Sequence, residues 1–125
     1  MGRNRFLLLI DDDRELGEVV AVALAQEGFA VRVALDAETA LHYVNDDTAL
    51  VLLDVLMPGM EACEFARRYR SRAGHVAPVV VFSASSHAKE FAEAIDAAGV
   101  LQKPFELEDL IELANRHLGT VAAFD

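Results

Sequence analysis

The residues of this sequence that could do chemistry stand directly after short apolar runs. They follow four different runs and are, in order, Asp11, Asp12 and Asp13, then Asp54, Ser83 and Lys103. A carboxylate nucleophile, a hydroxyl group and a lysine are together suited to moving a phosphoryl group onto an aspartate. The set therefore predicts phosphoryl chemistry, provided that the fold brings these side chains together.

The carboxylates in this set also predict a bound cation. Two unit charges about 4 Å apart repel each other by roughly 4 kcal/mol at an effective dielectric of 20, and one lysine offsets only part of that repulsion. Carboxylate oxygens, with open positions for water and a phosphate, suit Mg²⁺ or Mn²⁺ rather than zinc. We therefore expect Mg²⁺ as the cofactor, with Mn²⁺ as the alternative.

Five strands and five helices must alternate along the chain to position these groups. Short apolar runs predict strands at 6–10, 30–34, 49–53, 79–82 and 100–102. Apolar residues at helical spacing predict helices around 16–24, 37–44, 62–69, 88–95 and 107–118. Asp36 is placed to cap the second helix, and Asp13 suits the start of the first.

Alternating strands and helices predict an α/β fold with a doubly wound, five-stranded parallel sheet and helices on both faces. The second and fifth strands are the least apolar, so we place them at the edges, which gives the flavodoxin-like order 2-1-3-4-5. In such a sheet, ligands bind at the carboxyl ends of the strands, where the polar set falls. We expect one domain over 1–125, with its core at 5–118 and a tail at 119–125.

Composition narrows the class of function. The chain has 125 residues, 54% of them hydrophobic, and a net charge of −10, which disfavours binding of nucleic acid by this chain alone. Its nearest basic patch is the run Arg67, Arg68, Arg70 and Arg72, which we interpret as a solvated helix face or a surface for an acidic partner. No apolar run approaches the roughly 18–20 residues of a membrane span, and Cys63, expected to pack in the third helix, is the only cysteine. We expect a cytoplasmic protein that does not contact a membrane.

Residues 5–118 resemble the receiver domains of two-component signalling systems. The matching stretches are Leu-Leu-Leu-Ile-Asp-Asp-Asp at 7–13, Leu-Leu-Asp-Val-Leu-Met-Pro-Gly-Met at 52–60, Val-Phe-Ser-Ala at 81–84 and Gln-Lys-Pro-Phe at 102–105. Each stretch is weak by itself, but their order and spacing together are specific.

The resemblance implies a role for each residue of the set. Asp54 is then the phosphoacceptor, Ser83 engages the phosphoryl group, and Lys103 bridges to it. The resemblance also implies a cis peptide bond between Lys103 and Pro104. The resemblance also implies the metal ligands, namely Asp12 and Asp54 directly, the backbone carbonyl of Leu56, and Asp11 through water.

Three positions depart from the family pattern. Val100 stands where the family usually has Tyr or Phe, so the usual aromatic switch cannot operate, and output must travel by another route such as the loop from Ser83 to Ala88. Glu61-Ala62 replaces a common Asp-Gly, which could alter the loop there. Leu56 cannot position a water molecule by hydrogen bonding, so we expect slow self-dephosphorylation.

The sequence favours a phosphoryl-accepting switch that is not a turnover enzyme. The resemblance implies a sensor histidine kinase or phosphotransfer protein as donor and leaves open the downstream protein target, as well as a dimer through the fourth and fifth helices. One alternative is a degenerate receiver that binds partners without phosphorylation. Another is an aspartate-nucleophile phosphohydrolase, which Leu56 argues against, since such enzymes place a second carboxylate two residues after the nucleophile.

Overall fold

The computed structural model describes residues 5–57, 60–72, 74 and 76–119. The predicted loop at Pro58 and Gly59 and the end of the predicted tail from 120 onward lie outside them. Ten elements alternate along the chain: β1 (Phe6–Ile10), α1 (Arg14–Gln26), β2 (Ala30–Ala34), α2 (Ala37–Tyr43), β3 (Thr48–Leu53), α3 (Ala62–Arg70), β4 (Val79–Ser83), α4 (Ala88–Ala94), β5 (Gly99–Gln102) and α5 (Leu107–Leu118). Each predicted strand and helix is present, which confirms the expected alternation.

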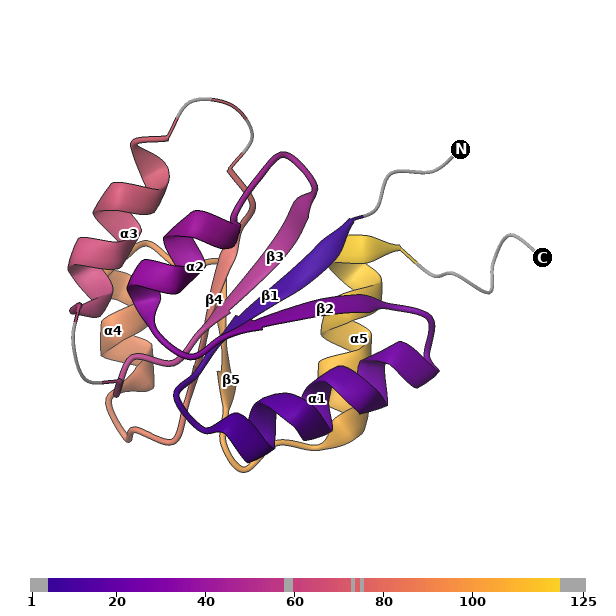
Figure 1. The fold of residues 1–125 in the computed structure, drawn as a ribbon. Coiled ribbons are helices and arrows are strands. Elements are labelled where there is room, and N and C mark those ends of the chain that lie inside the picture. The colour runs from indigo at the N-terminus through magenta and orange to yellow at the C-terminus, as the bar shows by residue number, and fades with distance from the viewer. Residues whose placement is uncertain (1–4, 58–59, 73, 75, 120–125) are drawn as a thin grey trace.

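The strands form one parallel sheet in the order β2-β1-β3-β4-β5, as predicted. Figure 1 shows α1 and α5 on one face of the sheet and α2, α3 and α4 on the other. The inner strands β1, β3 and β4 are buried throughout, whereas β2 and β5 alternate between exposed and half-buried positions, as edge strands do. The confirmed fold class is therefore a doubly wound α/β sheet.

Side chains of the inner strands alternate between two separate cores. Leu8, Ile10 and Val51 belong to the core beneath α2, α3 and α4. Leu7, Leu9 and Leu52 belong to the core beneath α1 and α5. Because neighbouring residues of a strand point to opposite faces, one continuous apolar run supplies both cores.

Two apolar residues within the predicted helices do not face the core. Val19 is 64% exposed and Leu107 is also exposed, because α1 buries the stripe Gly17, Val20 and Leu24 and because Leu107 begins α5. Cys63 is exposed rather than packed, since α3 turns its other apolar positions toward the sheet. Glu61 and Ala62, which replace the common Asp-Gly, do not need the left-handed backbone conformation that glycine favours. Glu61 has a φ of −67°, and Ala62 is the first residue of α3.

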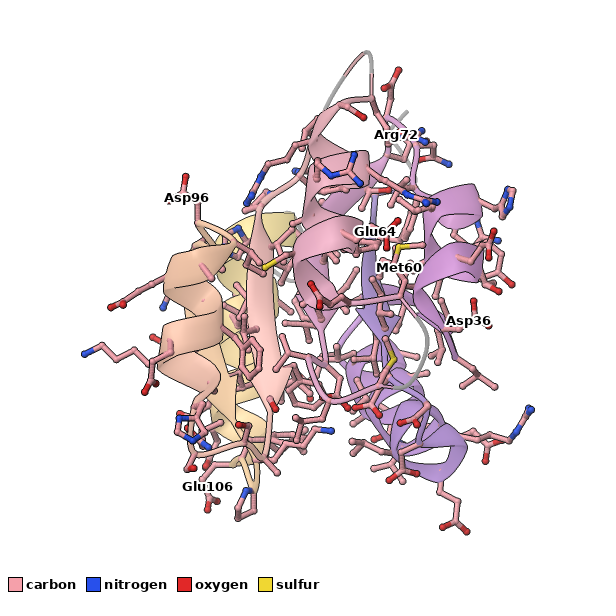
Figure 2. All side chains as sticks on the ribbon, turned by 90° about the vertical axis from the view of Figure 1, so that its left-hand side faces the viewer. Asp36, Met60, Glu64, Arg72, Asp96 and Glu106 are labelled. Carbon is pink, nitrogen blue, oxygen red and sulfur yellow. The ribbon has the colours of Figure 1, made fainter. Side chains whose placement is uncertain are left out.

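Two of the four arginines in the predicted basic patch hydrogen-bond to main-chain carbonyls of the fold. The guanidinium of Arg70 donates to the carbonyls of Ile95 and Asp96, and that of Arg72 donates to the carbonyl of Val44 at 3.0 Å. These carbonyls lie at the ends of α4 and α2, on either side of α3 (Figure 2). Arg70 and Arg72 therefore tie three helices together, whereas Arg67 is 73% exposed and Arg68 pairs with Glu64 at 2.6 Å, as on a solvated helix face.

The two aspartates predicted at helix N-termini are both caps. Asp13 and Asp36 accept hydrogen bonds from the Leu16 and Thr39 amides at 3.1 and 2.7 Å. By contrast, His87 occupies the N-cap position of α4, with no side-chain capping bond. Over the described ranges (5–57, 60–72, 74 and 76–119), no helix is both long enough and apolar enough to cross a membrane.

Candidate functional site

Three aspartates meet at the carboxyl ends of β1 and β3. These strands are neighbours, and the Asp54 amide donates to the Ile10 carbonyl at 2.9 Å, which places Asp54 beside Asp11 and Asp12. One carboxylate oxygen from each of the three lies within 4.8 Å of the others. Asp11 is 1% exposed and Asp54 is 8% exposed, while Asp12 is exposed to solvent.

Lys103 enters this cluster from the end of β5. Its Nζ atom lies 2.6 Å from Oδ2 of Asp11 and 3.6 Å from Oδ2 of Asp54. The lysine amide donates to the Ser83 carbonyl at 2.9 Å, and the Lys103–Pro104 bond is cis, as expected. Asp11, Asp12, Asp54 and Lys103 are thus brought together by three strands that lie far apart in sequence.

Two aromatic rings lie beside the Lys103 side chain. Its Nζ atom lies 4.7 Å from the centroid of the Phe82 ring, which in turn meets Phe105 edge to face. A cation over an aromatic face is attracted to the ring's negative centre. We did not predict this role for Phe82 from the sequence, although its place immediately before Ser83 could have suggested it.

The electrostatic environment disfavours charge on Asp54. Burial raises the pKa of its carboxyl group, and the neighbouring Asp11 and Asp12 add to the rise. The Leu56 amide, which donates to Oδ1 at 2.9 Å, and the Lys103 ammonium lower the pKa but do not cancel the effect of burial. A divalent cation near these oxygens would favour the ionised form.

Ser83 ends β4 next to Lys103 and is fully buried. Its Oγ atom accepts a hydrogen bond from the Ser85 amide at 3.1 Å, and Ser85 Oγ accepts one from the His87 amide at 3.0 Å. Ser85 thus organises the loop before α4, whose N-cap is His87.

Another residue that sequence reasoning missed is Gln102. Its side-chain amide donates to the Ser85 carbonyl at 2.9 Å and so connects β5 to the β4–α4 loop. A polar residue directly before Lys103 in an edge strand was the available signal. Val100, two residues earlier, is 38% exposed.

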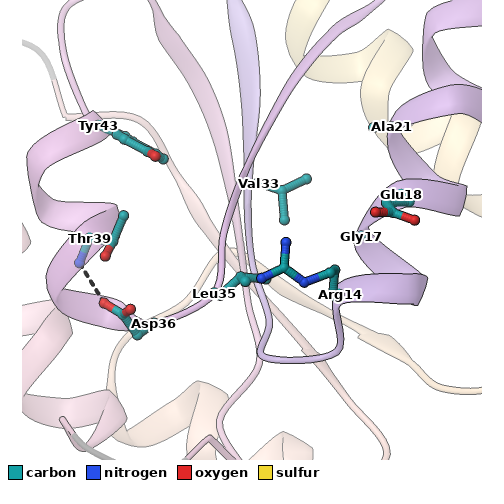
Figure 3. A pocket seen from close by; sticks show the side chains of 9 residues that line it. All are labelled: Arg14, Gly17, Glu18, Ala21, Val33, Leu35, Asp36, Thr39 and Tyr43. Carbon is teal, nitrogen blue, oxygen red and sulfur yellow. Dashed lines mark hydrogen bonds between the residues drawn. The ribbon is translucent and has the colours of Figure 1, made fainter.

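A separate hollow of about 430 Å³ lies along β2 between α1 and α2 (Figure 3). Its polar lining includes Arg14, Glu18 and Asp36, and the Asp36 carboxylate already accepts the hydrogen bond of the Thr39 amide. None of the three clustered aspartates lines this hollow. The chemistry predicted from the sequence therefore belongs to the carboxyl edge of the sheet.

Comparison with known protein families identifies the family of this chain. The sequence model of the response regulator receiver domain matches residues 7–115. The chain belongs to this family. It is thus a receiver domain of a two-component response regulator, a family of signalling switches.

Curated relatives extend beyond the matched region. The transcriptional regulatory protein TctD of Salmonella typhimurium is 40% identical over 107 residues, covering 83% of this chain and 47% of that protein. Response regulator MprA of Mycolicibacterium vanbaalenii is 35% identical over 108 residues, covering 84% of this chain and 46% of that protein. This receiver domain spans about half the length of these relatives.

Solved receiver structures share the fold over nearly their full length. The response regulator receiver protein from Burkholderia phymatum matches with a TM-score of 0.76 and 29% identity, covering 94% of this chain and 97% of that chain. The response regulator protein TrrA from Thermotoga maritima, solved in complex with Mg(2+)-BeF, matches with a TM-score of 0.75 and 27% identity, covering 90% and 97%.

Proposed function

We propose that this receiver domain accepts a phosphoryl group on Asp54 from a sensor histidine kinase or a phosphotransfer protein and passes the signal to a protein target. The observation that carries the proposal is the meeting of Asp11, Asp12, Asp54 and Lys103 at one edge of the sheet. The domain assists its own phosphorylation and dephosphorylation but is not a turnover enzyme.

In the proposed transfer, an oxygen of the Asp54 carboxylate attacks the phosphorus of a donor phosphohistidine. The new P–O bond makes an acyl phosphate, the P–N bond breaks, and its electron pair stays on the histidine nitrogen. Lys103 already lies 3.6 Å from Asp54 Oδ2, where its ammonium can pair with a phosphoryl oxygen. The Ser83 hydroxyl would donate a hydrogen bond to another phosphoryl oxygen.

The carboxylates of Asp11, Asp12 and Asp54 fit a hard divalent cation, since their oxygens converge within 4.8 Å. We assign them to Mg²⁺, or to Mn²⁺, with Asp12 and Asp54 and the Leu56 carbonyl as direct ligands and Asp11 acting through water. When bound, the cation would neutralise charge that develops on the phosphoryl oxygens. The Mg(2+)-BeF complex of the Thermotoga relative supports this assignment.

The test is phosphorylation by acetyl phosphate followed by intact mass. We expect a single phosphoryl adduct with Mg²⁺, none with EDTA, and none in Asp54→Asn. Asp96→Asn makes the same chemical change at an exposed aspartate outside the cluster and should leave the adduct intact. If the wild type binds Mg²⁺ but forms no adduct, the proposal fails in favour of a binding module that works without phosphorylation.

The lifetime of the acyl phosphate should depend on Leu56. Its apolar side chain is exposed immediately beyond the acceptor and cannot hydrogen-bond a water molecule for attack on phosphorus. We expect Leu56→Asn to shorten the lifetime by about tenfold, the factor that corresponds to one hydrogen bond of about 1.4 kcal/mol. Following the decay of the phosphorylated mass measures this, and an unchanged lifetime would contradict the idea; Leu56→Met is the matched apolar control.

A further inference from the structure

The outer edge of β2 is open for a further strand. Among the described residues, β2 pairs with β1 on one side and with no strand on the other. The Ala34 carbonyl accepts a hydrogen bond from the Asp11 amide and therefore faces β1. Because successive residues of a strand direct their backbone groups to alternate sides, the N–H and C=O groups of Val31 and Val33 point outward. Such a row of outward groups is a template for pairing with another chain.

The hollow of about 430 Å³ lies along this edge, with α1 on one side and α2 on the other (Figure 3). The helix α1 comes close to the strand because Gly17 has no side chain, and a Cβ atom there would lie 2.8 Å from Cγ1 of Val33. The other apolar lining residues are Ala21, Leu35 and Tyr43. A strand added to β2 would therefore direct alternate side chains toward α1 and toward α2.

Two charged side chains that line the hollow, Arg14 and Glu18, have no hydrogen bond or ion pair with the described part of the chain. By contrast, the Asp36 carboxylate is engaged by the Thr39 amide. Figure 3 shows the Arg14 guanidinium turned toward Leu35, the residue that follows β2. The hollow thus offers one unpaired cation and one unpaired anion to a ligand.

The spacing of these two charges matches an extended chain that runs parallel to β2. Such a chain would end at the carboxyl edge of the sheet, where Arg14 begins α1. From this edge α1 runs back along the sheet, so Glu18 lies one turn farther from the edge (Figure 1). Four helical residues rise about 6 Å, and two strand residues rise about 6.6 Å. A terminal carboxylate near Arg14 would therefore place the side chain two residues earlier near Glu18.

We propose that the outer edge of β2 binds the free C-terminal segment of a partner protein as a sixth, parallel strand, with a lysine or arginine two residues before its last residue. Arg14 pairs with the terminal carboxylate, which a guanidinium can bind through two parallel hydrogen bonds. Glu18 pairs with the basic side chain. The net charge of −10 attracts a basic segment and disfavours a second copy of this chain. Binding at this edge needs no phosphoryl group on Asp54.

The first test uses the peptide acetyl-Thr-Thr-Val-Lys-Val-Val with a free C-terminal carboxylate or with a C-terminal amide. Each form is titrated into the full chain by calorimetry. We expect the carboxylate form to bind about tenfold more tightly, the factor for one hydrogen bond between charged groups. In Arg14→Gln the two forms should bind equally, whereas the matched control Arg116→Gln, at an exposed arginine of α5, should keep the tenfold preference. No binding of the carboxylate form, or a preference that survives Arg14→Gln, overturns the proposal.

The second test concerns the basic side chain of the peptide. Glu18→Gln should weaken the carboxylate form about threefold, as loss of an exposed ion pair does, and should leave its preference over the amide unchanged. Replacing the lysine of the peptide with methionine should then have no further effect. Glu15→Gln is the matched control, since Glu15 is exposed on the same helix and does not line the hollow. Equal weakening in the two variants would mean that net charge attracts the peptide and that Glu18 does not pair with it.

The third test asks whether the peptide pairs as a strand. Two further peptides carry a methyl group on one backbone nitrogen, either that of the lysine or that of the valine after it. Only one of two successive N–H groups can point toward β2, so one methylated peptide should bind about tenfold more weakly than the other. Equal affinities of the two methylated peptides overturn strand addition, even if the carboxylate preference depends on Arg14.

Discussion

The carboxyl edge of the sheet and the opposite edge, where α2, α3 and α4 end, both use charged side chains but pair them with different groups. At the opposite edge, Arg70 and Arg72 donate to main-chain carbonyls, and the Tyr69 hydroxyl donates to the Ala77 carbonyl at 2.8 Å. At the carboxyl edge, three carboxylates cluster, and the Lys103 ammonium lies close to two of them, Asp11 and Asp54. Figure 2 labels both ends, with Arg72 and Asp96 near one and Glu106 near the other.

The difference separates stabilising contacts from reactive ones. Donors matched with neutral carbonyls satisfy buried polar groups without adding repulsion, and each such bond contributes to stability. Carboxylates held close together repel, and burial raises the pKa of Asp54 further. The carboxyl edge therefore keeps a concentration of negative charge that lowers stability and that fits the cation and phosphoryl group of the proposed function.

The largest expected effect on stability comes from the opposite edge. Arg70→Met removes the charged donor of two carbonyls, and hydrogen bonds to charged groups suggest a loss of about 2 kcal/mol in the free energy of unfolding. Phosphorylation by acetyl phosphate should be unchanged. Urea denaturation measures the loss, and Arg67→Met, at a side chain that is 73% exposed, is the control. If both variants lost the same free energy of unfolding, the contacts of Arg70 with the two carbonyls would not be what stabilises the opposite edge.

A slightly smaller effect should follow from adding the metal to the carboxyl edge. At a Mg²⁺ concentration ten times its Kd, linkage predicts a gain of about 1.4 kcal/mol in the free energy of unfolding. Asp12→Asn should lose most of this gain. Asp13→Asn should keep it, because Asp13 caps α1 and asparagine caps a helix equally well. If the gain in the free energy of unfolding depended on Asp13 instead, the metal site would have to include Asp13 rather than Asp12.

The smallest expected effect is on the free energy of unfolding of Asp54→Asn, which should exceed that of the wild type by an amount that depends on pH. Urea denaturation in EDTA measures this difference. The folded pKa of Asp54 is raised above 3.8, so the unfolded chain releases its proton first, and wild-type stability falls as pH rises through the interval between the two pKa values. The asparagine variant lacks this fall, so its advantage should grow above pH 3.8 and level off once the folded carboxyl is ionised. A difference between the two proteins that does not depend on pH would mean that burial does not raise the pKa of Asp54.

The sequence was sufficient for the fold and for the identity of the clustered residues. Continuous apolar runs and the polar residue after each one predicted the strand order and the meeting of Asp11, Asp12, Asp54 and Lys103. The long-range side-chain contacts of Gln102 and Arg70 were not predictable, because they join segments whose relative placement the pattern leaves open. Val19 shows the limit on helix faces, since α1 buries Gly17 where a larger residue would be expected to mark the stripe.

The two cores share no side chain, since one lies beneath α2, α3 and α4 and the other beneath α1 and α5. A substitution that disturbs the packing beneath α4 should therefore leave the side-chain packing beneath α1 intact. The two layers of the domain can thus be repacked one at a time, because the sheet lies between them.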